Sequence, residues 1–217
     1  TTDCERLSPT TPPMTDAIDA IIDDLRAEAD QDRDPETTPD VGIVMGSDSD
    51  LDTMAGAYEA LDELGFTEQT DYSEDVAGYS YESYVVSAHR TPDLMYAYAE
   101  TAEARGLDVL IAGAGGKSAD LPNMTASIAY PLPVIGVPVQ EKSVSSVIGM
   151  PTGAPIVAVD AGKSFNAALS AAQILARSDP ELADRLVAYH EDLETDVAGV
   201  SRDLHERGID GFREKHG

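Results

Sequence analysis

A histidine and an arginine stand side by side in the segment SAHRTPD, residues 87–93. His89 can carry a proton near neutral pH, and the Arg90 guanidinium can grip a phosphate with two hydrogen bonds. The neighbouring cation and a helix start at Pro92 both disfavour an imidazolium, so we expect a neutral His89 that is ready to accept a proton. A lone histidine more often has a structural role, and from these residues alone that alternative stays open.

A glycine and two serines precede a predicted helix in the segment GSDSD, residues 46–50. Glycine lets a ligand approach the backbone closely, the amides at a helix start point outward, and Ser47 and Ser49 can donate hydrogen bonds. This combination is typical of phosphate binding. The alternative is simple capping of the helix by a serine or an aspartate. Because carboxylates repel phosphate, Asp50 is better suited to accept hydrogen bonds from ribose hydroxyls.

A third segment, AGAGGKS at residues 112–118, is rich in glycine. It is not a triphosphate-binding P-loop, because that motif needs a glycine where Ile111 stands. It is not a dinucleotide-binding fingerprint either, since Ser118 occupies the place of the last glycine. What remains is a backbone loop that a ligand can approach closely.

The chain is strongly acidic, with 41 acidic residues against 14 basic ones and a formal net charge of −27 at pH 7. Such a surface repels nucleic acids and anionic membranes, so we expect neither as a partner. Because the acids are spread along the chain, we interpret them as an adaptation to concentrated salt, as in a halophilic archaeon. Lys117, Lys142 and Lys163 each follow a predicted strand and could attract an anionic ligand there. The alternative is chance combined with loop exposure.

Other features narrow the class of protein. Cys4 is the only cysteine, so neither a disulfide within the chain nor a cysteine cage for a metal can form. No apolar run approaches the roughly 18 residues that a membrane span needs, and the N-terminus lacks the pattern of a secretion signal. We therefore expect a cytoplasmic protein.

Short apolar runs alternate with helical patterns from Val41 onward, which predicts a three-layer, doubly wound α/β domain with a parallel sheet. Strands are predicted at residues 41–45, 84–87, 109–112, 134–137 and 156–159. Helices are predicted at residues 50–64, 92–105 with Thr91 as cap, from about 143, and at 165–176. Ligands bind such sheets at the carboxyl ends of the strands, where the three polar segments fall.

The two ends of the chain differ from this middle domain, which we place at residues 41–178. Residues 1–40 are predicted to be an extension with an unstructured start, one short helix capped by Thr15 and an acidic linker. Residues 179–217 are predicted to form a long C-terminal helix with an apolar stripe. This stripe could pack on its own domain or on a neighbouring subunit, and the pattern leaves both open.

Taken together, these segments resemble the PurE family of purine biosynthesis. The resemblance rests on VGIVMGSDSD at 41–50, SAHRTPD at 87–93, the glycines of 113–116 with LPNM at 121–124, and the stretches 133–139, 150–155 and 166–176. It implies a flavodoxin-like fold and a homo-octamer. It also implies isomerisation of N5-carboxyaminoimidazole ribonucleotide to 4-carboxyaminoimidazole ribonucleotide, without a metal or an organic cofactor.

By position, the resemblance implies that Ser47, Asp50 and Arg90 bind this phosphorylated ribonucleotide and that His89 is the general acid and base. The expected ligand contacts also include the neighbouring polar and glycine positions Ser49, Ser87, Gly113, Gly115, Gly116 and Lys117.

The sequence departs from the mutase pattern of the family after the glycines. That pattern continues Ala-Ala-His-Leu-Pro, whereas this chain has KSAD at 117–120 before Leu-Pro, so the histidine is missing. Gly-Lys-Ser is somewhat similar to the Gly-Arg-Ser of relatives that carboxylate aminoimidazole ribonucleotide with free carbon dioxide. Because His-Arg-Thr-Pro favours the mutase, we expect a mutase and keep the direct carboxylase as the alternative. A receiver-type regulator is least favoured, since the strands ending at Ser87 and Ala112 lack the aspartate it needs.

Overall fold

Six parallel strands form one sheet in the computed structural model, which describes residues 14–31, 33–34, 37–70 and 76–216. Their order across the sheet is β2-β3-β1-β4-β5-β6. The strands are β1 (Val41–Met45), β2 (Thr67–Glu68), β3 (Ser80–Val85), β4 (Val109–Ala114), β5 (Val134–Pro138) and β6 (Val157–Ala158). The predicted parallel α/β architecture is confirmed. The expectations for residues 1–13, Cys4 among them, lie outside the described residues.

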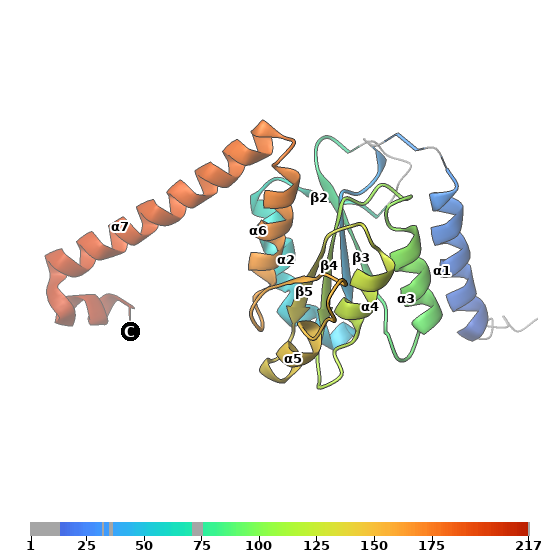
Figure 1. Ribbon diagram of the computed structural model, residues 1–217. Helices are drawn as coiled ribbons and strands as arrows, with labels where there is room; N and C mark the ends of the chain where they lie inside the picture. Colours follow the sequence, from blue (N-terminus) through green and yellow to red (C-terminus); the bar gives the residue numbers. More distant parts are fainter. Residues whose placement is uncertain (1–13, 32, 35–36, 71–75, 217) are drawn as a thin grey trace, which may run out of the picture.

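Helices cover both faces of the sheet (Figure 1). One face carries α1 (Met14–Ala29), α3 (Pro92–Thr101) and α4 (Leu121–Ile128), and the other carries α2 (Leu51–Glu63) and α6 (Ser164–Leu175). Two short 3-10 turns, η2 (Asp48–Asp50) and η3 (Glu141–Ser143), precede α2 and the short helix α5 (Val144–Val147). Successive residues of a strand face opposite layers, so Val44 joins one core and Ile43 the other.

The strand predicted at 84–87 lies earlier in the structure, because β3 spans Ser80–Val85. Its first half carries a buried charge that an apolar pattern cannot reveal. Glu82 is 1% exposed and accepts hydrogen bonds of 2.8 and 2.9 Å from the Arg105 guanidinium. A buried ion pair therefore replaces apolar packing at this point of the sheet. Arg105 itself follows α3, which ends at Thr101 rather than at the predicted residue 105.

Two elements are absent from the predictions, the short edge strand β2 and helix α4. The LPNM sequence opens α4, because a proline is tolerated in the first turn of a helix, where its missing N–H is not needed. The predicted capping by Thr91 is also wrong in detail. Thr91 is the first residue before α3, but its hydroxyl accepts a hydrogen bond of 2.9 Å from the Ser87 backbone amide and makes no capping bond.

The N-terminal helix α1 is part of the packed body. Ile22 and Leu25 are buried in the core that α1 shares with α3. The Glu28 carboxylate lies 3.5 Å from Arg105 Nη1, so α1 also covers the buried ion pair of β3. The helix therefore shields a polar cluster that would otherwise be open to water.

The predicted long C-terminal helix is present as α7 (Pro180–His216), which runs away from the body of the molecule (Figure 1). Its regular geometry is interrupted at Gly208, which has a φ of 67°. Leu182 is buried, whereas the apolar stripe farther along is exposed at Val187, Leu193, Val197, Val200, Leu204 and Ile209. The inner part of the stripe, at Leu182, Leu186 and Tyr189, packs on its own domain, whereas the part from Leu193 onward is exposed. None of the helices in the described part of the chain combines the length and apolar character needed to cross a bilayer.

Candidate active site

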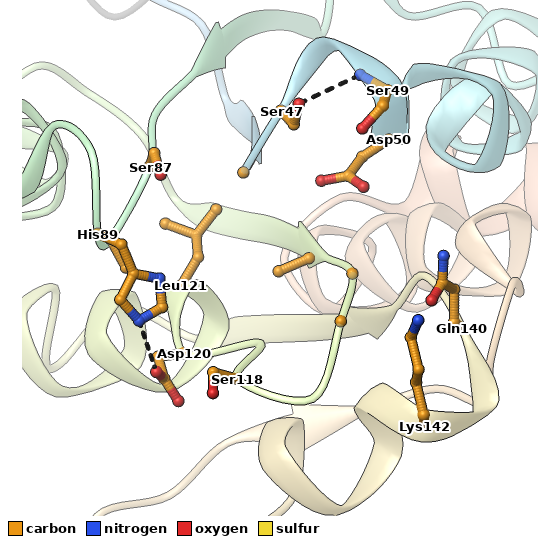
Figure 2. Close-up of a pocket in the computed structure, with 15 residues that line it drawn as sticks. Ser47, Ser49, Asp50, Ser87, His89, Ser118, Asp120, Leu121, Gln140 and Lys142 are labelled. Carbon is orange, nitrogen blue, oxygen red and sulfur yellow. Dashed lines mark hydrogen bonds and ion pairs between the residues drawn. The ribbon is translucent and has the colours of Figure 1, made fainter.

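The candidate active site is a cavity of about 330 Å³ at the carboxyl edge of the sheet. Because β1 lies between β3 and β4, and β5 follows β4, the loops after these four strands converge on one place. Figure 2 shows side chains from all four loops around the cavity. Seven of the ten expected site residues line it, namely Ser47, Ser49, Asp50, Ser87, His89, Gly115 and Gly116.

The loop after β1 supplies two hydroxyls and a buried carboxylate. Ser47 caps η2, since its oxygen accepts a hydrogen bond of 3.4 Å from the Ser49 backbone amide. Both serines still line the cavity, so capping and ligand contact are compatible here. The Asp50 side chain lies where its two oxygens would contact a Cβ added at Gly46 or Gly115, so these two glycines make room for it. Burial raises the pKa of the Asp50 carboxyl, and the charge of Arg90 opposes that rise.

Arg90 fixes two of the loops to each other. Its Nη2 donates a hydrogen bond of 2.9 Å to the carbonyl oxygen of Gly46, and its Nε lies 3.4 Å from the Ser87 hydroxyl. The side chain therefore ties the loop after β3 to the loop after β1. Arg90 is not among the residues that line the cavity.

His89 lies in hydrogen-bonding contact with an aspartate from the loop after β4 (Figure 2). Its Nε2 lies 3.1 Å from Oδ2 of Asp120, with the His89 side chain 61% exposed and the Asp120 side chain 42% exposed. Asp120 stands directly before α4, at the place where the sequence lacks the histidine of the mutase pattern. The cavity thus contains an imidazole that can carry a proton, and a carboxylate lies within hydrogen-bond distance of one of its ring nitrogens.

The glycine-rich loop after β4 divides into residues with different roles. Gly116 lines the cavity with a φ of 87°, a conformation that favours glycine. Gly113 instead lies within β4, where an added Cβ would overlap the Met54 sulfur. Lys117 is exposed and does not line the cavity.

Four further polar or charged residues line the cavity but are absent from the expected site residues: Ser118, Asp120, Gln140 and Lys142. Lys142 could have been identified as a site residue from the sequence, because the chain has few lysines and this one follows the strand predicted at 134–137. It brings a positive charge opposite the loop after β1 (Figure 2). Within the described residues, no group of three or more His, Cys, Asp or Glu side chains is arranged to hold a metal ion.

The sequence of the chain is similar to those of known proteins. The family model described as AIR carboxylase matches residues 40–196. The N5-carboxyaminoimidazole ribonucleotide mutase of Bacillus subtilis is 47% identical over 174 residues, which cover 76% of this chain and 98% of that protein. The mutase of the same name from Synechocystis sp. is 44% identical over 181 residues, covering 81% and 94%.

The fold agrees with this match. The crystal structure of Treponema denticola PurE superimposes with a TM-score of 0.62 at 26% identity, covering 76% of this chain and 97% of that chain. The matched residues 40–196 include all six strands and every loop of the cavity, whereas α1 and the outer part of α7 lie outside them. The chain therefore belongs to the PurE family, the family of the AIR carboxylase domain.

Proposed function

We propose that this protein is a mutase that converts N5-carboxyaminoimidazole ribonucleotide to 4-carboxyaminoimidazole ribonucleotide in purine biosynthesis. The observation that carries the proposal is that His89 lines one cavity together with Ser47, Ser49, Asp50 and Lys142, groups that are suited to bind a phosphate and a ribose. The relatives support it, since proteins named for this activity are 43–47% identical and match over more than nine tenths of their length.

The lining residues suit a phosphorylated ribonucleotide. The Ser49 hydroxyl can donate to a phosphate oxygen, and the Ser47 hydroxyl can do so if it releases Oδ1 of Asp48, to which it donates a hydrogen bond of 2.9 Å. Lys142 adds a positive charge in a chain that has few. The Asp50 carboxylate can accept hydrogen bonds from ribose hydroxyls. Arg90 holds the two loops in place and can bring its charge to a phosphate if it releases Gly46.

His89 carries the proton in the proposed mechanism. In its protonated form it gives a proton to the carbamate nitrogen while the N–C bond breaks and carbon dioxide leaves, and this transfer leaves the imidazole neutral. The ring carbon then attacks the trapped carbon dioxide, forming the new C–C bond, and the neutral imidazole removes the ring proton. The loop around Gly115 and Gly116 lines the cavity that would hold the gas. Keeping it in place makes recapture intramolecular, which can contribute on the order of 7 kcal/mol.

The proposal also covers the oligomeric state of the protein and its cellular compartment. We infer a homo-octamer in the cytoplasm, as the family resemblance implies. The exposed apolar side chains of α7 support contacts between subunits, because an isolated helix gains nothing from exposing them.

A specific observation keeps the direct carboxylase as a second candidate. The matching family model is described as AIR carboxylase, and the Gly116-Lys117-Ser118 sequence is similar to that of the carboxylating relatives. An isotope experiment distinguishes the two reactions. The nucleotide labelled in its carboxylate is supplied with excess unlabelled bicarbonate, and label is followed into the 4-carboxy product. Retained label supports the mutase. Loss of label, with turnover of the uncarboxylated nucleotide driven by bicarbonate, refutes it and supports the carboxylase.

His89→Asn tests the assigned proton carrier. We expect the variant to bind the nucleotide but to lose turnover by about 10²-fold or more, because the amide cannot exchange a proton. His190→Asn is the matched control, since His190 lies on α7 with a side chain that is 72% exposed. Turnover by His89→Asn within about tenfold of the unmodified enzyme would overturn the assigned role.

A further inference from the structure

We propose that Asp120 is a positioning residue that orients His89, so that Nδ1 is the ring nitrogen that exchanges the proton with the substrate. The inference rests on the proposed function, because it concerns the proton carrier of that reaction. The contact that suggests it is the 3.1 Å separation of Asp120 Oδ2 and His89 Nε2. The two residues are 31 positions apart in the chain and meet only because β3 and β4 flank β1.

Both oxygens of the Asp120 carboxylate are committed. Oδ2 faces His89 Nε2, and Oδ1 accepts a hydrogen bond of 3.3 Å from the Ser146 hydroxyl. Asp120 occupies the N-cap position of α4, where an aspartate normally accepts a hydrogen bond from the first turn. Here its side chain makes no capping bond. The carboxylate is turned away from its own helix and toward the histidine.

The partner on the far side of the carboxylate is itself held in place. Ser146 belongs to α5, and its carbonyl oxygen accepts a hydrogen bond of 2.5 Å from the Asn123 side chain on α4. Two hydrogen bonds thus join α4 to α5 around Asp120. Because the Ser146 backbone is held in this way, its hydroxyl stays beside the carboxylate and limits the rotation of Asp120. The carboxylate in turn limits rotation of the imidazole ring.

The chemistry of imidazole gives this contact a consequence. A neutral imidazole has one N–H and one acceptor nitrogen, and the hydrogen bond at one nitrogen selects the form that is present. When Nε2 donates its hydrogen to Asp120, Nδ1 becomes the acceptor and is free to remove the ring proton. Because both side chains are substantially exposed, we assign the carboxylate an orienting role rather than a strong electrostatic one.

Asp120→Ala is the direct test, carried out with the full-length protein. We expect kcat to fall by about 10- to 100-fold while the Kd of the nucleotide changes by less than about threefold, because the ring loses its orientation and the binding groups remain. Asp120→Asn keeps the size and one acceptor oxygen, so its loss of kcat should be smaller. Urea unfolding should show only a small loss of stability for both variants, since no capping bond is removed and the contacts with Ser146 and His89 are partly exposed.

Chemical rescue separates orientation from a general structural role. Added formate can occupy the space left in Asp120→Ala and accept the Nε2 hydrogen, so it should restore part of kcat at constant ionic strength. It should not restore His89→Asn. Ser146→Ala should lower kcat modestly, whereas Ser127→Ala, which removes a hydroxyl from an exposed part of α4, should leave kcat unchanged.

The outcomes distinguish this inference from the proposed function. If the unmodified enzyme turns over the nucleotide but Asp120→Ala keeps kcat within about threefold, the positioning role is refuted and the mutase remains. A rise in Kd with unchanged kcat, or a fall in kcat that formate does not restore, also refutes it. An unmodified enzyme without turnover of the carboxylated nucleotide refutes both.

Discussion

Replacing Asp40 by asparagine should stabilise this protein at neutral pH. Asp40 lies just before β1, where its Oδ2 accepts a hydrogen bond of 2.7 Å from the Ser80 backbone amide. Burial raises the pKa of this carboxyl from an ordinary value of 3.8 to about 6. The negative charge of Asp108 contributes to the rise, and the hydrogen bond from Ser80 opposes it.

The direction of the pH dependence follows from the sign of this shift. Because folding raises the pKa, the folded state holds the proton more tightly than the unfolded state does. The stabilisation is present below about pH 4 and is lost as the pH rises through about 6. A difference of about two pKa units corresponds to at most about 3 kcal/mol, and partial exposure of the group reduces this figure. We expect Asp40→Asn to gain about 1–2 kcal/mol at pH 7.5, because it removes the charge and keeps an acceptor for Ser80.

Urea unfolding at fixed high salt, from about pH 4 to pH 7.5, measures this effect. The free energy of unfolding of Asp40→Asn minus that of the unmodified protein should be near zero at the acid end and should grow to a plateau above about pH 6. Asp23→Asn, which removes one exposed carboxylate from α1, is the control for net charge. A difference that does not change with pH, or an Asp40→Asn variant that is less stable at pH 7.5, would refute the reasoning.

Four further predictions address the core, the site and the surface. Glu82→Gln should lower the free energy of unfolding by about 3–5 kcal/mol in urea, because it leaves the buried charge of Arg105 without its closest carboxylate; a loss below about 1 kcal/mol would contradict this. Lys142→Gln should raise KM several-fold at low salt and less at high salt, whereas Lys117→Gln, which lies outside the cavity, should leave KM unchanged. Equal changes of KM in the two variants would refute an electrostatic role for Lys142. Val197→Lys should yield a smaller species in light scattering if the α7 stripe joins subunits, and an unchanged mass would exclude that contact. The melting temperature of the unmodified protein should fall as potassium chloride is diluted, because its acidic groups repel one another; a constant melting temperature would contradict the salt-adaptation interpretation.

The sequence predicts those parts of the fold in which burial and pattern agree. The run Val41–Met45 is apolar throughout because β1 is covered on both faces, and its prediction is correct to the residue. The pattern fails at β3 because Glu82 is buried by pairing with an arginine that lies 23 residues later. No local signal distinguishes such a glutamate from an exposed one. At β3 the limit of prediction is therefore set by a long-range pairing of charges.

The same reasoning separates the predictable from the unpredictable part of the candidate site. Ser47, Asp50 and His89 follow strands whose carboxyl ends must meet, so their convergence follows from the alternation of strands and helices alone. Predicting the contact of His89 with Asp120 requires three further facts. These are the order of the strands, the presence of helix α4, and the absence of a capping bond from the Asp120 side chain to that helix. Asp120 is visible in the sequence only as a departure from a family pattern, which marks the position without giving its partner. The structure supplies the partner, and the proposed role of Asp120 therefore depends on tertiary geometry that no spacing of residues encodes.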